Sequence, residues 1–312
     1  MGYHPRIECT KLASFQTTRA RNSELWFVNN ADLEQAVLGY AARYITRYQV
    51  IMYALAIEGN HAHLTCRFPK GNRSQFMRDF NSSVARAVAR FQQNYPGGRL
   101  WARRYSSEFL GANEDIEEYF FYTVLQPVND GLVDDIRDYP GYNCFEDAVM
   151  GREKKYKVIN WKKYNDAKRW DPEISPDDFT EICTLKFTRL PGYEKLSQTD
   201  YASLMRKKLQ ERTAKILEAR KQSGSVGTKR LRRVMPGSRP KRTKTSGRTD
   251  HRPRVLAKNP KRHAKLSSWY FSVQFRYRDC SKRYREGHPD VRFPKGTYKP
   301  PLFTTAFTGS VL

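Results

Sequence analysis

The sequence predicts an α+β sandwich in residues 1–150, followed by an extension that is basic, partly disordered and partly helical. Strand-like and helix-like stretches alternate up to residue 150 in the order strand, helix, hairpin, helix, strand. This is the order of a ferredoxin-like sandwich, and we expect helices to cover one face of a central antiparallel sheet. Of the 312 residues, 39% are hydrophobic, which is enough apolar material for such a core.

Four short stretches are expected to form the sheet, because they are apolar or Thr-rich and six to eight residues long. The break at Glu58, Gly59 and Asn60 predicts a hairpin turn between the second and third stretches. The predicted strands are residues 14–19, 50–57, 61–68 and 105–110.

Three helices are expected beside this sheet. Apolar residues recur at three- and four-residue spacing over Ala31–Tyr48 and again over Arg73–Asn94. An acidic stretch that begins at Asn113 predicts a third helix, with Asn113 as its cap and the carboxylates at the positive end of the helix dipole.

The second half of the chain divides by composition. Residues 151–224 contain a helical stretch over Thr199–Lys221. Residues 221–265 hold 16 Lys and Arg against one acidic residue, so residues 225–265 are predicted to be a basic flexible linker. Residues 266–312 form an aromatic and basic tail, in which Ser267–Tyr284 fits both a strand and a helix pattern and favours a helix by its length.

The net charge of +25 indicates a polyanionic partner, because it is confined to one half of the chain. Residues 1–150 hold 16 Lys and Arg against 17 Asp and Glu, whereas residues 151–312 hold 41 against 15. An anionic membrane is disfavoured, since the longest apolar run, Val50–Ile57, is far shorter than the roughly 20 residues of a spanning helix. We therefore expect a nucleic-acid partner.

The start of the chain and its cysteines indicate the compartment. The first ten residues lack the apolar core of a signal peptide. The five cysteines are widely spaced and form no C-x-x-C pair, which disfavours disulfides and zinc. A cytoplasmic protein is expected, associated with the nucleoid if the source is bacterial.

Two histidines are the first candidates for chemistry. His61 and His63 lie on a predicted strand directly after a turn, so both side chains project from one face while Ala62 packs on the other. Two neutral imidazoles on one face can hold a divalent metal. Taken alone, the His-x-His pattern is also compatible with two ordinary histidines.

Tyr122 and Gln126 are the second candidates, because a spacing of four places both on one face of the third helix. Pro127 disfavours helix at Gln126 and leaves the Gln126 carboxamide near the helix end. Tyr122 follows the aromatic residues Phe120 and Phe121, so a core position is the competing interpretation.

These stretches resemble the single-tyrosine HUH transposases. Tyr53–Leu64 is similar to their His-hydrophobic-His hairpin, and Tyr122–Val133 is similar to their tyrosine helix and the turn after it. Order and spacing agree over about residues 10–147, and further similar segments are Trp101–Tyr105, Asp138–Tyr142 and, as in long REP-associated tyrosine transposases, Asp290–Tyr298. The chain departs from the family pattern at Glu58-Gly59, which replace Met-Pro, at Gln126, where Asn is common, and at Asn129-Asp130, which replace Arg-Ala.

The resemblance implies an HUH endonuclease fold for residues 1–150 and a metal-dependent transposase acting on single-stranded DNA that is hairpin-flanked or repetitive and palindromic. In this family Tyr122 would be the nucleophile that forms a 5′-phosphotyrosine link. His61, His63 and Gln126 would hold Mg²⁺ or Mn²⁺. The chain could work as a monomer or as a homodimer.

Basic and aromatic side chains are candidates for DNA contacts, since phosphates attract Lys and Arg and unpaired bases stack on aromatic rings. Tyr105 can equally belong to the core. Two other functions stay open: a catalytically silent DNA-binding regulator on the same fold, and another HUH nickase such as a replication initiator or relaxase. The candidate DNA-binding residues are Arg103, Arg104, Tyr105, Arg230, Arg232 and Arg233.

Overall fold

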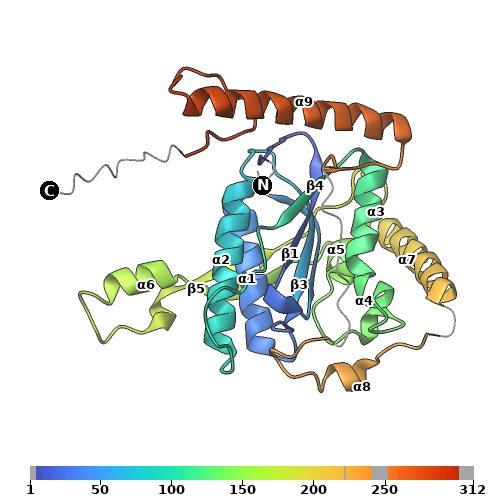
Figure 1. Ribbon diagram of the computed structural model, residues 1–312. Helices are drawn as coiled ribbons and strands as arrows, with labels where there is room; N and C mark the ends of the chain where they lie inside the picture. Colours follow the sequence, from blue (N-terminus) through green and yellow to red (C-terminus); the bar gives the residue numbers. More distant parts are fainter. Residues whose placement is uncertain (1–4, 221–222, 241–251, 302–312) are drawn as a thin grey trace.

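The computed structural model describes residues 5–220, 223–240 and 252–301 (Figure 1). At its centre is a five-stranded sheet with the strand order β2-β3-β1-β4-β7. The first four strands in this order pair antiparallel, which is the ferredoxin-like arrangement, so the predicted fold class is confirmed. The strands are β1 (Ala13–Arg19), β2 (Ile51–Glu58), β3 (His61–Arg67), β4 (Ser106–Leu110) and β7 (Val255–Leu256).

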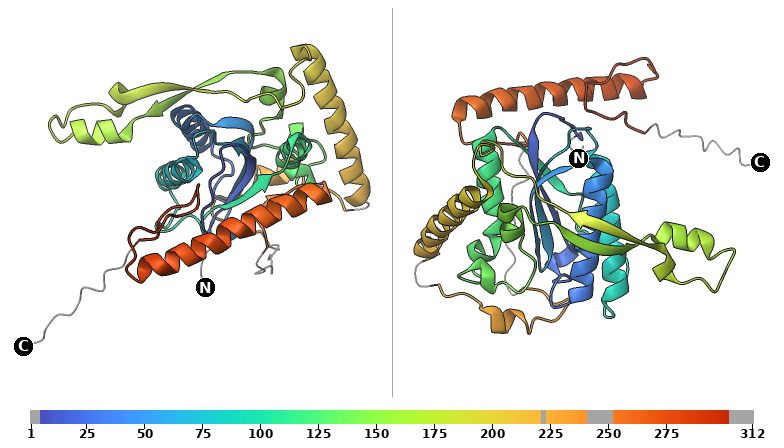
Figure 2. Two further views of the ribbon diagram at one scale, coloured as in Figure 1. Left: turned by 90° about the horizontal axis from the view of Figure 1, so that it is seen from above. Right: turned by 180° about the vertical axis from the view of Figure 1, so that it is seen from behind.

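Helices cover both faces of this sheet, which corrects the expectation of one covered face. Helices α1 (Ala31–Tyr48) and α2 (Arg73–Phe91) pack together on one face, and α3 (Asn113–Val124) lies on the other (Figures 1 and 2). The second face is covered because α3 has an apolar side of its own, with Phe120, Phe121 and Val124 buried.

The first residues of α1 and α3 differ in how their backbone N–H groups are capped. The Asn30 side chain accepts a hydrogen bond from the Leu33 backbone N–H and caps α1. Helix α3 begins at Asn113, but Ala112 occupies the cap position and no side chain caps it, so the predicted Asn113 cap is wrong. Instead, the Asp115 carboxylate in the first turn accepts a hydrogen bond of 2.8 Å from the backbone N–H of Lys258.

An arm that the sequence did not predict leaves the core after α4 (Gln126–Asn129) and α5 (Phe145–Met150). It is a two-stranded antiparallel sheet, β5 (Lys154–Ile159) and β6 (Thr180–Leu185), with α6 (Trp161–Ala167) between the strands (Figure 2). The base of the arm packs on α1 at Gly39, where a Cβ atom would lie 2.7 Å from Cγ2 of Val158. The close approach of helix and hairpin therefore requires glycine at this position.

The extension wraps around the sandwich. Helix α7 (Gln198–Arg220) runs beside α3, α8 (Thr228–Leu231) lies below it, and α9 (Pro260–Arg285) crosses the other end (Figure 1). The helix expected from the length of Ser267–Tyr284 is present and begins earlier, at Pro260. Tyr270 of α9 is buried in a small cluster with Ile7, Phe109 and Val255.

The described parts of the predicted linker, residues 225–265, are packed against the core. The backbone N–H groups of Val226 and Gly227 donate to the carbonyls of Gly131 and Leu132, at 2.9 Å each. Strand β7 pairs parallel with β4 and so extends the central sheet. Residues 241–251 lie outside the described residues. Composition alone could not reveal this packing, because it comes from backbone hydrogen bonds and a few apolar side chains.

The sequence disfavours disulfides and a membrane-spanning helix. All five cysteines are free thiols. Within residues 5–220, 223–240 and 252–301, no helix combines the length and the apolar character that crossing a membrane requires.

Candidate active site

The paired histidines lie side by side on β3. His61 and His63 are each 4% exposed, and their ring centroids are 4.6 Å apart. Thr65 continues the same face and donates a hydrogen bond to the backbone carbonyl of Tyr119 in α3. The alternation of β3 therefore places both imidazoles between the sheet and α3, as the strand pattern predicted.

The tautomer of His61 is set by its neighbour. The Asn60 Nδ2 group donates to the backbone carbonyl of Ser23 at 2.9 Å, which leaves the Asn60 Oδ1 atom facing Nδ1 of His61 at 2.7 Å. An amide oxygen only accepts, so Nδ1 of His61 carries the proton and Nε2 carries a lone pair. The Asn60 side chain thus prepares His61 to bind a cation through Nε2.

His63 is held by two residues of β1. Oγ1 of Thr17 lies 3.1 Å from Nδ1 of His63, and the ring of Phe15 stacks on the imidazole with 5.1 Å between centroids. The Nε2 atom of His63 is buried and has no hydrogen-bond partner among the described residues. A buried polar atom without a partner is costly, so this nitrogen is a candidate metal ligand.

Both imidazoles are neutral at physiological pH. Burial lowers the pKa of His61 to about 4, with a further contribution from the positive charge of Arg19. Burial likewise moves the pKa of His63 well below its usual value, and His61 and Arg19 add to the effect. Neutral imidazole is the form that binds metal.

Tyr122 faces the histidine pair from α3. Its ring stands edge-on to His63 at 5.9 Å and edge-on to Phe15 at 5.4 Å. The side chain is 41% exposed, whereas Phe120 and Phe121 beside it are buried, so the competing core interpretation of Tyr122 does not hold. Burial, followed by the negative charges of Asp130 and Glu58, raises the pKa of Tyr122.

Gln126 lies one turn after Tyr122, at the junction of two helices. Helix α3 ends at Val124, so Gln126 lies near the helix end as Pro127 predicts, but Gln126 itself is helical, as the first residue of α4. The Oε1 atom of Gln126 is buried without a hydrogen-bond partner among the described residues. Nε2 of His63 is in the same condition, so both atoms are candidate ligands of a divalent cation, as is His61.

Two carboxylates beside the histidines were missed by the sequence analysis. One ligand atom each from Glu58, His61 and Asp130 lie within 4.8 Å of one another. Burial, with the charge of Asp130 next, raises the pKa of Glu58 to about 8. Both positions are departures from the transposase pattern, and that was the only signal in the sequence.

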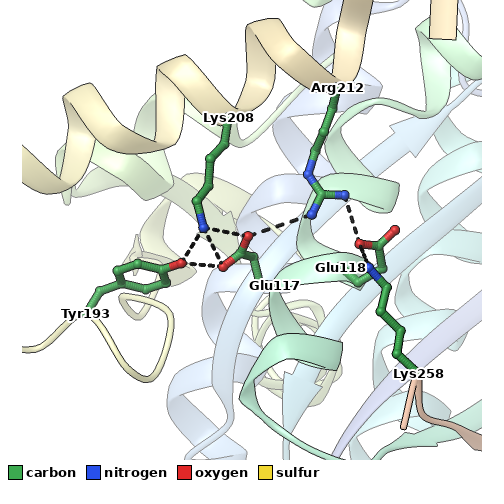
Figure 3. Close-up of polar contacts among 6 residues, drawn as sticks. All are labelled: Glu117, Glu118, Tyr193, Lys208, Arg212 and Lys258. Carbon is green, nitrogen blue, oxygen red and sulfur yellow. Dashed lines mark hydrogen bonds and ion pairs between the residues drawn. The ribbon is translucent and has the colours of Figure 1, made fainter. Parts of the chain in front are cut away.

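The extension holds the helix that carries Tyr122 (Figure 3). Lys208 and Arg212 of α7 pair with Glu117 and Glu118 of α3, at 2.8 Å in each case. Lys258, just before α9, pairs with Glu118 at 2.6 Å from the other side. Basic side chains from two parts of the extension therefore form ion pairs with the acidic side of α3.

The first group of candidate DNA-binding residues precedes β4. Arg103 and Arg104 are exposed, while Tyr105 is half-buried against the core. The backbone N–H of Ala102 donates to the carbonyl of Arg19, and Arg19 is paired with His61 across β1 and β3. With two strand spacings of about 4.8 Å, this segment is roughly 10 Å from the histidines.

The second group, Arg230, Arg232 and Arg233, is exposed on and after α8. This segment follows the backbone pairing with Gly131 and Leu132, and so begins next to Asp130. A cavity of about 650 Å³ is lined by both Arg232 and Gly59, and Gly59 lies in the turn before His61.

Comparison with known proteins supports the family prediction. The sequence profile of the family described as "Transposase IS200 like" matches residues 18–122, from β1 to Tyr122. This confirms the family resemblance over these residues and supports a transposase-type function. No curated protein matches the chain.

One solved structure that matches is described as "Structure of the REP associates tyrosine transposase bound to a REP hairpin". The sequence identity is 18%, the TM-score is 0.40, and the match covers 47% of this chain and 84% of that chain. A likeness at this level does not bear on function.

Proposed function

We propose that this chain, whose residues 18–122 match the IS200-like transposases, is a metal-dependent strand transferase that acts on single-stranded or hairpin DNA in the cytoplasm. The observation that carries the proposal is the position of Tyr122: it is 41% exposed and stands edge-on to His63. A tyrosine that is partly open to solvent and stands against the neutral imidazole of His63 is suited to nucleophilic attack beside a metal.

The proposed reaction exchanges one phosphodiester for another. The Tyr122 hydroxyl oxygen bonds to the scissile phosphorus, its proton leaves to solvent, and the 3′-oxygen departs and takes up a proton. The 5′-phosphate stays on Tyr122, so a 3′-hydroxyl of a second strand can reverse the step and join the strands. The pKa of Tyr122 is raised by burial, so its hydroxyl is protonated at physiological pH and the proton must leave as the oxygen–phosphorus bond forms.

His61, His63 and Gln126 are the residues proposed to hold Mg²⁺ or Mn²⁺. When bound, the cation would polarise the phosphoryl oxygens and stabilise the leaving alkoxide. The chain supplies the lone pair of His61 through the Asn60 hydrogen bond, and the unpartnered His63 Nε2 and Gln126 Oε1 atoms.

DNA would approach along the exposed basic side chains before β4 and those on and after α8. Arg103 and Arg104 would contact phosphates beside β4, and the half-buried Tyr105 would stack on an unpaired base. Arg230, Arg232 and Arg233 would bind the strand beyond Asp130.

The test is covalent capture. The protein is incubated with single-stranded DNA from its own genomic flanks, with and without Mg²⁺, and the products are separated on a denaturing gel. The wild type and Tyr119→Phe should form a covalent protein–DNA band with Mg²⁺, whereas Tyr122→Phe should bind DNA without forming one. A band with Tyr122→Phe would refute the assignment, and DNA binding without any band in the wild type would favour a silent regulator.

A further inference from the structure

We infer that Glu58 and Asp130 are carboxylate ligands of a divalent cation beside His61, so that this chain holds its metal with an acidic ligand set. The inference deepens the proposed function and rests on it, since both require a cation at His61. The family resemblance implies only histidines and a carboxamide as ligands, so these two carboxylates are a property of this chain.

The three side chains converge at the hairpin turn. Glu58 ends β2 and His61 begins β3, and the two are paired across the turn. Oε2 of Glu58 lies 4.0 Å from Nε2 of His61, the nitrogen that carries the lone pair. Asp130 completes the group from the end of α4, with all three ligand atoms within 4.8 Å of one another. Ligands on opposite sides of Mg²⁺ are about 4 Å apart, so a small side-chain rotation of the exposed Asp130 closes the site.

Buried polar atoms without hydrogen-bond partners also point to a bound cation. Glu58 is 2% exposed, and its Oε1 atom has no hydrogen-bond partner among the described residues. Nε2 of His63 and Oε1 of Gln126 are in the same condition. A buried carboxylate oxygen without a donor is costly, and a cation would satisfy it. These three atoms come from three elements, β2, β3 and α4.

An acidic ligand set changes what DNA meets at the site. The Asp130 carboxylate, together with Glu58 once it is ionised, repels a phosphate beside Tyr122, and a bound divalent cation cancels this charge. The scissile phosphate should therefore enter only after the cation has bound. The sequence of binding events is then cation first and DNA second.

Binding of Mn²⁺ to the full chain without DNA tests the inference, because it does not depend on cleavage. Free Mn²⁺ is measured by electron paramagnetic resonance during a titration of wild type, Glu58→Gln, Asp130→Asn and His61→Ala. Glu58→Gln and Asp130→Asn should each weaken Mn²⁺ binding at least about tenfold, since even the partners of metal ligands contribute that much. Asp134→Asn is the matched control, because Asp134 pairs with Arg220 at 3.2 Å and is outside the group of three.

Thermal unfolding with and without Mn²⁺ shows whether each variant is folded, and a folded variant that has lost the cation site should lose the Mn²⁺-induced rise in Tm. Equal Mn²⁺ affinity in wild type, Glu58→Gln and Asp130→Asn, with loss only in His61→Ala, would overturn the inference and leave the proposed function standing. A covalent band with Tyr122→Phe would instead refute the proposed function, whatever the Mn²⁺ affinities.

Discussion

The ring of Tyr122 stands edge-on to the ring of His63, with 5.9 Å between their centroids. The two residues are 59 positions apart and come from a helix and a strand on opposite sides of an interface. Their contact places a nucleophile candidate beside a metal-ligand candidate, and the predictions below depend on that arrangement.

Removing either imidazole should abolish cleavage. His61→Ala and His63→Ala should each lower the cleavage rate at least about 100-fold, because a metal contributes several kcal/mol to stabilising phosphoryl charge. Both variants should keep the circular dichroism spectrum of the wild type. Ala62→Leu is the control: Ala62 faces the other side of the sheet, so overpacking should cost about 1–3 kcal/mol of unfolding free energy and leave Mn²⁺ affinity unchanged. Full activity of the wild type in excess chelator would contradict the metal assignment.

The stability of the metal-free protein should fall as the pH rises from 6.5 to 8. The pKa of Glu58 is raised from 4.5 to about 8, so the folded state holds a proton that the unfolded state has released between these two pH values. The contribution of Glu58 to the free energy of unfolding is therefore full below pH 4.5 and is lost as the pH rises through 8. The pKa of His61 is lowered from 6.5 to about 4, so its contribution is present above pH 6.5 and is lost as pH falls through 4. Above pH 6.5 the slope therefore comes from Glu58, at up to about 1.4 kcal/mol per pH unit.

Urea denaturation at pH 6.5 and pH 8, in wild type and Glu58→Gln, checks this. The variant should lose less stability than the wild type over this interval. Equal losses in the two proteins would show that Glu58 is not protonated in the folded state.

The ion pairs between α7 and α3 should affect the cleavage rate more than the affinity for DNA. Arg212 pairs with Glu118 and lies over the Phe121 ring at 4.5 Å. Arg212→Ala should lower the unfolding free energy by about 1 kcal/mol and slow cleavage, because α3 carries Tyr122. Lys207→Ala removes the same charge from an exposed position of α7 and should change neither. A drop in DNA affinity with an unchanged cleavage rate at saturation would instead make Arg212 a DNA contact.

The arginines of the α8 segment should account for part of the salt dependence of DNA binding. Deleting residues 225–262 would remove β7 and the start of α9, so point substitutions are the cleaner test. The triple change Arg230→Ala, Arg232→Ala and Arg233→Ala should lower the log–log salt slope on single-stranded DNA by about 2, at about 0.7 for each phosphate contact.

The matched control is Lys155→Ala, Lys157→Ala and Lys162→Ala, three exposed cations of the arm. Affinity for one hairpin oligonucleotide is measured at several salt concentrations. If the log–log salt slopes of the two triple variants are equal, the arginines of the α8 segment do not contact DNA.

The sequence by itself determined the local elements that carry the chemistry. The twofold alternation of residues 61–68 placed His61 and His63 on one face, and Pro127 placed Gln126 just past the end of the helix that carries Tyr122. These features depend on near neighbours in the chain, so periodicity and one proline were enough to predict them. The helix boundaries of α1 were predicted for the same reason.

Only the tertiary structure decided which distant charges meet. Glu58 and Asp130 are 72 positions apart and become neighbours through the pairing of β2 with β3 and the docking of α3 and α4 on the sheet. The same holds for Lys208, Arg212 and Lys258, whose partners on α3 lie about 90 to 140 positions earlier. No local pattern encodes such contacts, because they arise from the free energy of packing whole elements together. The sequence thus predicted the candidate nucleophile and the candidate histidine and glutamine ligands, and the tertiary structure decided which charged side chains surround them.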